Sequence, residues 1–295
     1  MSRLTLQLRR SSVRVVVSTV VMVLGLQAVA TVPATAAANA FPRQVRSAFP
    51  TGTGKGFWLV YANGEVANVG DAPFFGDARN LPLNGPVLGG SAVSTGGGYW
   101  LVANDGGIFS YGSARFFGSM GAVRLNQPVF ATASTKSGNG YWLAARDGGI
   151  FSFGDAKFYG SMGGIPLQQP VVGIVRHPTG KGYTMVARDG GIFVFGDPGY
   201  FGSLPGNGLH VADVVGMAPS PLGRGYWIAR GNGQVYAFGN ALTFRSYTAS
   251  PCDPVVAIVA NPTRQGYRLV TRSGATIARG FGLAGQGTTG TPVSC

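Results

Sequence analysis

The stretch GYWLAARDGGIFSFG, residues 140–154, carries the two signals that decide the fold. An apolar and aromatic run, Gly140–Arg146, is separated from a second one, Gly149–Gly154, by the turn sequence Asp147-Gly148-Gly149. Aspartate and glycine tolerate the positive φ angles that tight hairpin turns demand, and the flanking runs have the length and composition of β-strands. The stretch therefore predicts an antiparallel β-hairpin.

This hairpin recurs along the chain with a period of about 42 residues. Its first aromatic residue, which we call the marker aromatic, falls at spacings of 42, 42, 42, 43 and 41. The six marker aromatics are Phe57, Tyr99, Tyr141, Tyr183, Tyr226 and Tyr267. Counting from these aromatics divides the chain into six units, 44–85, 86–127, 128–169, 170–212, 213–253 and 254–295. Side chains that recur at one phase are expected to serve the architecture, so function is sought where the repeat is broken.

Each unit predicts four short antiparallel strands, which in the third unit are Pro128–Ser134, Gly140–Arg146, Gly149–Gly154 and Lys157–Ser161. Four strands in 40–45 residues are typical of a propeller blade. The first strand is rich in small residues, as expected beside a crowded axis. We therefore predict an all-β protein, a six-bladed β-propeller of four-stranded antiparallel blades, as one domain over residues 41–295. A linear β-solenoid is the alternative, although its coils are usually shorter and lack a hairpin in every turn.

The N-terminus has the features of an export signal over residues 1–40. Four arginines precede an apolar run from Val15 to about Ala30, and small residues with several A-x-A sites follow it. We expect cleavage after Ala36 or Ala40, and hence a secreted, extracellular or cell-wall-associated protein without a stable membrane span. An uncleaved anchor is the alternative, because roughly 16 apolar residues are only slightly fewer than a span requires. Arg9-Arg10 leaves the twin-arginine route open beside the general one.

The chain has two cysteines, Cys252 and Cys295, at nearly the same phase of the repeat. An even number of cysteines in an exported chain predicts a disulfide, here one that ties the C-terminal end to the junction between units five and six. Two free thiols, or an intermolecular bond through Cys295, are the alternatives.

Composition narrows the class of partner. Charged residues make up 11% of the chain, against a usual share of about 25%. Removal of the signal takes four arginines and no acids from the net charge of +13, which leaves +9. That excess favours anionic partners such as wall polymers, acidic polysaccharides or membrane headgroups. The basic residues are scattered singly, which argues against nucleic acid. A solvated basic surface without a specific partner is the alternative.

Units two to four resemble the repeat of a family of secreted actinobacterial proteins. The resemblance rests on GYWLVANDGGIFS at 98–110 and on its copy from Gly140, because the family's unit reads roughly GYW-LVA-x-DGGIFSFGDA-x-FYGS followed by PVVG. It covers residues 44–295 and is weakest in unit six, where Arg268 replaces tryptophan and Ser273-Gly274-Ala275 replaces the turn. The resemblance implies export and a propeller fold. Such repeats occur alone or fused to cell-wall-active domains, and no catalytic residue can be transferred from them.

Reactive side chains are few. The two histidines, His177 and His210, fall at different phases, with no acid or cysteine placed to complete a metal site or a catalytic triad. We predict no catalytic residue, no cofactor and no metal. Three aspartates that depart from their repeat equivalents, Asp77, Asp213 and Asp253, are the candidates if the chain is a hydrolase or lyase. The recurring turn aspartates are expected to cap their own turns, and calcium there is the alternative.

A basic rim is the candidate binding site. Arg146, Arg188 and Arg272 stand at one phase immediately before the turn, and Arg230 stands one step earlier. Four guanidinium groups around one mouth of the channel would bind carboxylates or phosphates, and the alternative is that they only keep the turns soluble. Three more cations share a phase on the opposite face, Lys55, Lys181 and Arg224.

Four tryptophans offer a second kind of surface, since Trp58, Trp100, Trp142 and Trp227 could stack on sugar rings. Their position in the middle of a strand favours burial between blades instead. The leading hypothesis is a monomeric, secreted, non-catalytic propeller that binds an anionic or carbohydrate component of the cell envelope. The alternatives are a scaffold for a surface protein and, third, a propeller hydrolase or lyase.

Overall fold

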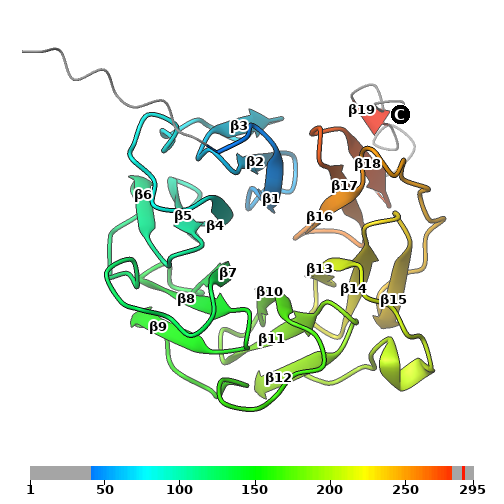
Figure 1. The fold of residues 1–295 in the computed structure, drawn as a ribbon. Coiled ribbons are helices and arrows are strands. Elements are labelled where there is room, and N and C mark those ends of the chain that lie inside the picture. Colours follow the sequence, from blue (N-terminus) through cyan, green and yellow to red (C-terminus); the bar gives the residue numbers. More distant parts are fainter. Residues whose placement is uncertain (1–40, 281–287, 290–295) are drawn as a thin grey trace, which may run out of the picture. The chain divides into compact units, whose positions relative to one another are not determined.

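The computed structural model describes residues 41–280 and 288–289, all within the unit formed by residues 36–295. The described strands form six antiparallel sheets, each built from strands that are consecutive in the chain (Figure 1). Five sheets have three strands, and the sixth has a short fourth one. We call each sheet a blade and number the blades in chain order.

The inner strands are β1 (Val45–Pro50), β4 (Val87–Ala92), β7 (Val129–Ser134), β10 (Val171–Arg176), β13 (Val214–Pro219) and β16 (Val255–Ala260). The middle strands are β2 (Phe57–Tyr61), β5 (Gly98–Ala103), β8 (Gly140–Ala145), β11 (Gly182–Ala187), β14 (Gly225–Arg230) and β17 (Tyr267–Thr271). The outer strands are β3 (Val66–Val69), β6 (Ile108–Gly112), β9 (Ile150–Gly154), β12 (Ile192–Gly196), β15 (Val235–Gly239) and β18 (Thr276–Arg279), with β19 (Thr288–Thr289) beyond β18. A 3-10 helix, η1 (Pro205–Asn207), precedes blade 5.

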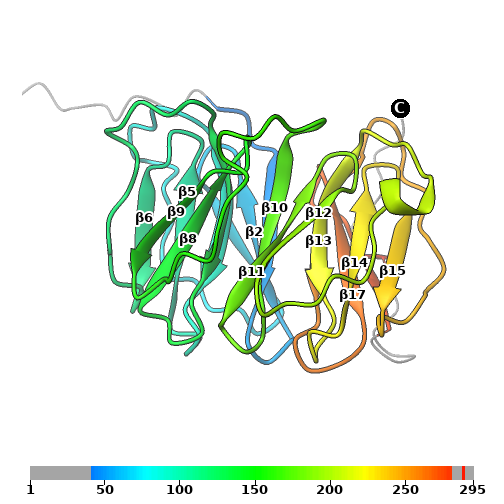
Figure 2. The same cartoon turned by 90° about the horizontal axis from the view of Figure 1, so that it is seen from below.

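The blades close into a ring. Each inner strand packs against the next, and β16 packs against β1 (Figure 1). Figure 2 shows the blades from the side, with their strands running roughly along the axis of the ring. The first inner-strand residue also donates its N–H to the turn of the preceding blade, as in Val171 to Arg146 O at 2.9 Å. The same bond, from Val45 to Arg272 O at 3.2 Å, joins the first blade to the last. The predicted six-bladed propeller architecture is therefore confirmed over the described residues.

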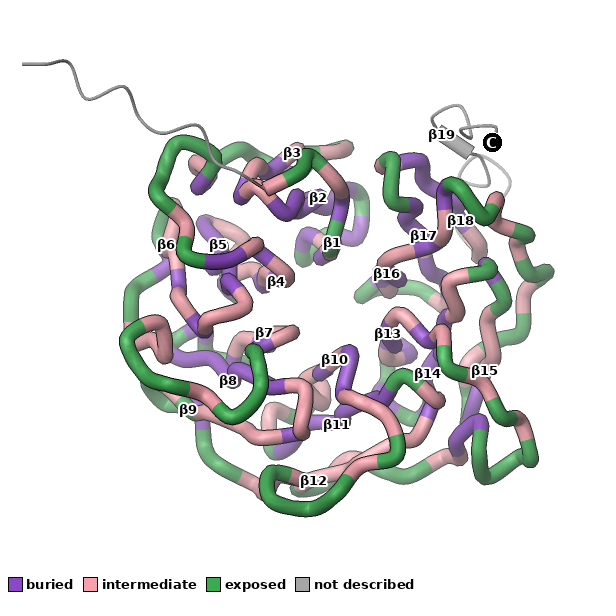
Figure 3. The backbone as a smooth tube through the Cα atoms, viewed as in Figure 1, coloured by how far each residue is buried: buried purple, intermediate pink, exposed green. Residues whose placement is uncertain are grey.

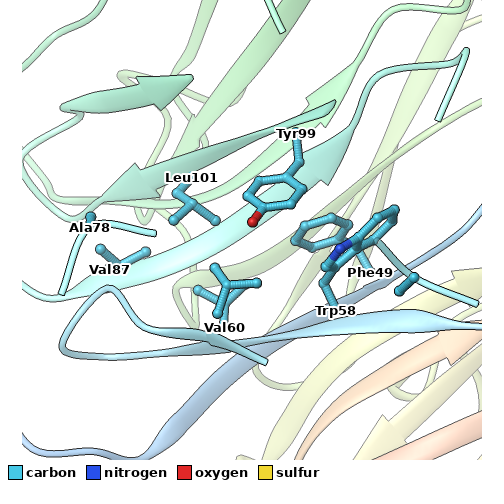
Figure 4. Packing of buried hydrophobic residues seen from close by; sticks show 9 residues of the cluster. Phe49, Trp58, Val60, Ala78, Val87, Tyr99 and Leu101 are labelled. Atoms are coloured by element: carbon cyan, nitrogen blue, oxygen red, sulfur yellow. The ribbon is translucent and has the colours of Figure 1, made fainter. Parts of the chain in front are cut away.

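The core lies between the blades rather than within any one of them. Middle strands are buried on both faces, and exposed residues gather in the turns and links (Figure 3). The cluster between blades 1 and 2 joins Phe49 and Trp58 of one blade to Tyr99 and Leu101 of the next (Figure 4). Tyr99 lies against both aromatic rings, with centroids 5.9 Å and 5.5 Å away. This two-sided burial explains why the middle strand is apolar at consecutive positions instead of alternating.

The prediction of a fourth strand in every blade is wrong for blades 1 to 5. In blade 3 the segment Lys157–Ser161 is not a strand, because side chains use its backbone polar groups. Trp142 Nε1 donates to Lys157 O at 2.8 Å, and the Tyr183 hydroxyl of blade 4 binds both Tyr159 N and Gly160 O, at 3.2 Å and 2.5 Å. The segment therefore serves as a link that the next blade holds in place.

Two predictions fall outside the described residues. Residues 1–40, the predicted signal peptide, are one, and Cys295, the predicted partner of Cys252, is the other. Export and the disulfide therefore stay predictions. Within 41–280 and 288–289, no helix is long and apolar enough to cross a membrane.

Candidate functional site

A channel runs along the axis of the ring. The six inner strands and the turns that follow them enclose a cavity of about 600 Å³. Much of its wall is small or apolar, for example Gly89, Ala131 and Ile174. The charged residues in the described lining are Arg46, Lys136 and Arg176, and no carboxylate is among them. The channel therefore favours anions over cations.

Arg46 reaches the channel through a bulge in the first strand pair. In every blade the register between inner and middle strands shifts at the same place, which for blade 1 is between Val45 and Ser47. Bulges of this kind redirect one side chain out of the regular alternation. The six bulged residues are Arg46, Leu88, Phe130, Val172, Val215 and Val256. Arg46 is thus the one charged side chain at a position that is otherwise apolar.

Arg146 lies near Arg46 and near a second predicted rim arginine, Arg188. The Arg146 guanidinium carbon lies 4.7 Å from the centroid of the Phe130 ring, over its face. Burial lowers the pKa of Arg146, and the positive charges of Arg188 and Arg46 lower it further. Arg188 is exposed, and its Nε donates to Ala212 O at 2.8 Å. Three guanidinium groups therefore gather at the mouth where the inner strands begin, a group that we call the arginine mouth.

The other two predicted rim residues have different surroundings. Arg230 Nε forms an ion pair with Asp213 Oδ1 at 2.6 Å, and its Nη1 donates to Gln234 Oε1 at 2.5 Å. Burial opposes the charge of Arg230, but the bond to Asp213 raises its pKa. Arg272 is exposed and serves ring closure through its carbonyl oxygen. The four arginines therefore do not form an even ring.

The three candidate acids have local partners and do not line the channel. Asp77 Oδ2 lies 2.8 Å from Arg79 Nε, and Asp213 is held by Arg230. Asp253 is buried and accepts bonds from the Ser273 N–H and hydroxyl, both at 2.7 Å. The channel mouth therefore does not bring two of these acids together.

The aspartates of the β-hairpin turns cap their own turns as predicted. Asp147 Oδ1 accepts the N–H of Gly149 at 2.9 Å, and Asp189 does the same for Gly191 at 2.8 Å. The prediction is wrong for Asp155, which follows β9 at a second recurring position. Its Oδ1 accepts from Thr135 Oγ1 at 2.8 Å, in the turn after β7. Among the described residues, no three His, Cys, Asp or Glu side chains are grouped to hold a metal ion.

The histidines and tryptophans are accounted for by local contacts. His177 Nδ1 lies 2.8 Å from Thr179 Oγ1 and 3.4 Å from Asp197 Oδ1, and His210 is exposed. The four tryptophans are buried between blades, as their mid-strand position predicted, and each indole N–H donates to a carbonyl of its own blade at 2.8 Å. Because their faces are covered, they do not offer the sugar-stacking surface.

Lys136 and Arg176 are channel residues that the sequence reasoning did not single out. The sequence does distinguish these two residues, because each is the only charged residue at its position in the repeat. Comparison of the six units position by position, rather than a search for shared basic phases, would have found them together with Arg46.

Ring closure and the channel define the chain as a β-propeller. No protein-family model and no curated protein matches the sequence. Among solved structures, the β-propeller domain of Cps50 (Swd1) from Myceliophteria thermophila is similar at a TM-score of 0.55 and 12% identity, over 78% of this chain and 81% of that one. A protein of unknown function from Bacteroides thetaiotaomicron is similar at a TM-score of 0.56 and 12% identity, over 81% of this chain and 69% of that one. At these identities the likeness concerns the fold alone.

Proposed function

We propose that this chain is an exported, non-catalytic β-propeller that binds an anionic or carbohydrate component of the cell envelope. The observation that carries the proposal is the charge of the channel, whose described lining holds three cations and no carboxylate. At one end the arginine mouth adds Arg146 and Arg188 to Arg46. Guanidinium groups bind carboxylates and phosphates through paired hydrogen bonds, which suits acidic wall polymers.

Export is the first part to test. If the signal is cleaved as we expect, mass spectrometry of the exported protein finds a chain that begins at Ala37 or Phe41. A cell-associated chain that retains residues 1–40 would contradict export by cleavage.

Binding is tested by retention of the protein on purified wall polymers in rising salt. The informative variant replaces Arg46, Arg146 and Arg188 together with glutamine. Its control replaces Lys55, Lys181 and Arg224 with glutamine. These exposed residues lie in turns at the opposite end of the strands, and their replacement removes the same amount of positive charge. We expect the first variant to bind at least about tenfold more weakly, since each charge-assisted contact contributes more than 1 kcal/mol, and the control to bind nearly as the native protein does.

Two results would refute the proposal. One is retention that does not fall as salt screens the charges. The other is an equal loss in both variants, because net charge rather than the arginine mouth would then decide binding.

A protein-interaction scaffold is the second candidate, favoured by a row of exposed aromatics. Phe74, Phe116, Phe158 and Tyr200 occupy the same position in the links that follow blades 1 to 4, and each is half exposed or more. Exposed aromatics are enriched where proteins meet. Crosslinking in intact cells tests this candidate, since one protein partner that depends on these aromatics favours the scaffold.

A further inference from the structure

At the end of the channel opposite the arginine mouth, two cations interrupt positions that are otherwise uncharged. The last inner-strand residue of each blade pairs with the marker aromatic of the middle strand, and these six residues are Pro50, Ala92, Ser134, Arg176, Pro219 and Ala260. Two residues further on stand Gly52, Ser94, Lys136, Pro178, Pro221 and Pro262. All twelve line the channel, and only Arg176 and Lys136 are charged.

The two cations come from neighbouring blades that touch at this end. Lys136 lies in the turn after β7, and Arg176 ends β10. A Cβ atom placed on Gly180, in the turn after β10, would lie 2.9 Å from the Cβ of Lys136. The turn that carries Lys136 therefore rests against the turn that follows Arg176.

Arg176 is half-buried and has no carboxylate partner among the described residues. Its Nη1 donates to the carbonyl oxygen of His177 at 3.3 Å. Asp197, the acid beside the neighbouring residue His177, accepts from Thr179 Oγ1 at 2.8 Å and lies 3.4 Å from His177 Nδ1. Burial lowers the pKa of Arg176. A guanidinium group that is removed from water without a counterion lowers the stability of the folded protein. The presence of Arg176 at this position therefore needs a reason other than stability.

Architecture does not supply that reason. The other five blades end the same strand with proline, alanine or serine, and they close the same ring. Of these six end positions, only the one in blade 4 brings a charged residue to the channel wall. Beside it, Arg176 lines a second, much smaller cavity of about 20 Å³ between blades 4 and 5.

We infer that this end of the channel is a binding site for one oxyanion group, a carboxylate or a phosphate, carried by a ligand whose neutral body fills the channel. Arg176 supplies the planar pair of donors, and Lys136 supplies a second positive charge. The wall around them is largely small and apolar, and its described part holds no carboxylate that would compete for either cation. A cavity of about 600 Å³ lies within the range that small-molecule sites occupy.

The test compares thermal unfolding of the full chain in sodium phosphate, sodium acetate and sodium chloride at equal ionic strength. The variants are Arg176→Met and Lys136→Met, which remove the charge and keep much of the side chain. The matched control is Arg224→Met, an exposed cation in the equivalent turn of blade 5. Isothermal titration with inorganic phosphate gives the affinity of each protein directly.

We expect phosphate or acetate at about 100 times its Kd to raise the Tm of the native protein and of Arg224→Met by roughly 5 °C over chloride. Arg176→Met should lose the rise, and Lys136→Met should bind about tenfold more weakly. In chloride Arg176→Met should melt at or above the native Tm, because an unpaired, half-buried charge is gone.

Three results would overturn the inference: no rise in the native protein, an equal rise in Arg176→Met, or a Tm of Arg176→Met in chloride well below the native value. The last would assign Arg176 a structural role. This site does not depend on the arginine mouth. Failure of wall-polymer binding therefore leaves the phosphate result standing, and loss of the phosphate effect in Arg176→Met leaves polymer binding to be judged by its own variants.

Discussion

The hydroxyl of Tyr141 provides a sharp test of how the blades are held together. It donates to Gly118 O at 2.6 Å and accepts the N–H of Phe117 at 3.1 Å, both in the link from blade 2. Tyr141→Phe removes one atom and leaves both backbone groups without that partner, while the buried ring stays in place. The variant therefore measures the hydrogen bonds that replace a fourth strand.

The expected loss follows from the number and burial of those bonds. An unsatisfied buried donor or acceptor costs about 1–3 kcal/mol. Phe117 and Gly118 are only partly buried, so water can replace some of what is lost. We therefore expect Tyr141→Phe to lower the free energy of unfolding by about 2–3 kcal/mol, which for a domain of this size lowers Tm by roughly 5–10 °C.

Tyr111 offers a matched control in which the same atom is removed. Its hydroxyl oxygen is buried and has no hydrogen-bond partner among the described residues, and the equivalent residues of blades 3 to 5 are phenylalanines. Tyr111→Phe should therefore leave stability unchanged or raise it by up to about 1 kcal/mol, because a desolvated hydroxyl is removed. Urea and thermal unfolding of the two variants beside the native protein decide the matter. Equal losses in both would refute the reasoning, since the link bonds could not then explain the difference.

Burial raises the pKa of Tyr226 to about 12, so the folded state keeps a proton that the unfolded state begins to release near pH 10. The urea midpoint should be constant below about pH 10 and fall between pH 10 and 12, and a flat profile there would contradict this. Gly90→Ala places a Cβ 2.5 Å from Phe49 Cε1 and should lower the free energy of unfolding, measured by calorimetry, by about 1–3 kcal/mol. Gly52→Ala places a Cβ with no atom of the described residues within 4 Å, and it should change the stability little. Non-reducing peptide mapping should find Cys252 linked to Cys295, and reduction should cost up to about 4 kcal/mol; recovery of two free thiols would show that the bridge is absent.

Much of the fold could be predicted because each unit carries its own local signals. The turn around Gly148, where φ is +78°, needs only the residues beside it, and Asp147 caps it from within the same turn. The period of the marker aromatics set the number of blades. The absence of a fourth strand could not be predicted in this way. The residue that holds the link after blade 3 is Tyr183, which lies in blade 4, 24 residues beyond Tyr159.

The candidate site was less predictable, because a cation's surroundings depend on how the strands pair and how the blades pack. Arg146 and Arg230 stand one step apart in the repeat, yet Asp213 pairs with Arg230 while Arg146 lies over Phe130 beside other arginines. Asp213 and Phe130 each belong to the same unit as the arginine they contact, but the sequence of that unit does not show that the two residues meet.

The sequence by itself determined the period, the β-hairpin of each unit and the closed all-β class, because turn chemistry and apolar runs act over a few residues. Only the tertiary structure decided where the charges lie. Arg46, Lys136 and Arg176 are far apart in the chain, and the ring brings them to one channel without a carboxylate in its described lining. Charge acts through space rather than along the chain, so only the closed ring shows which cations are neutralised and which face an open cavity.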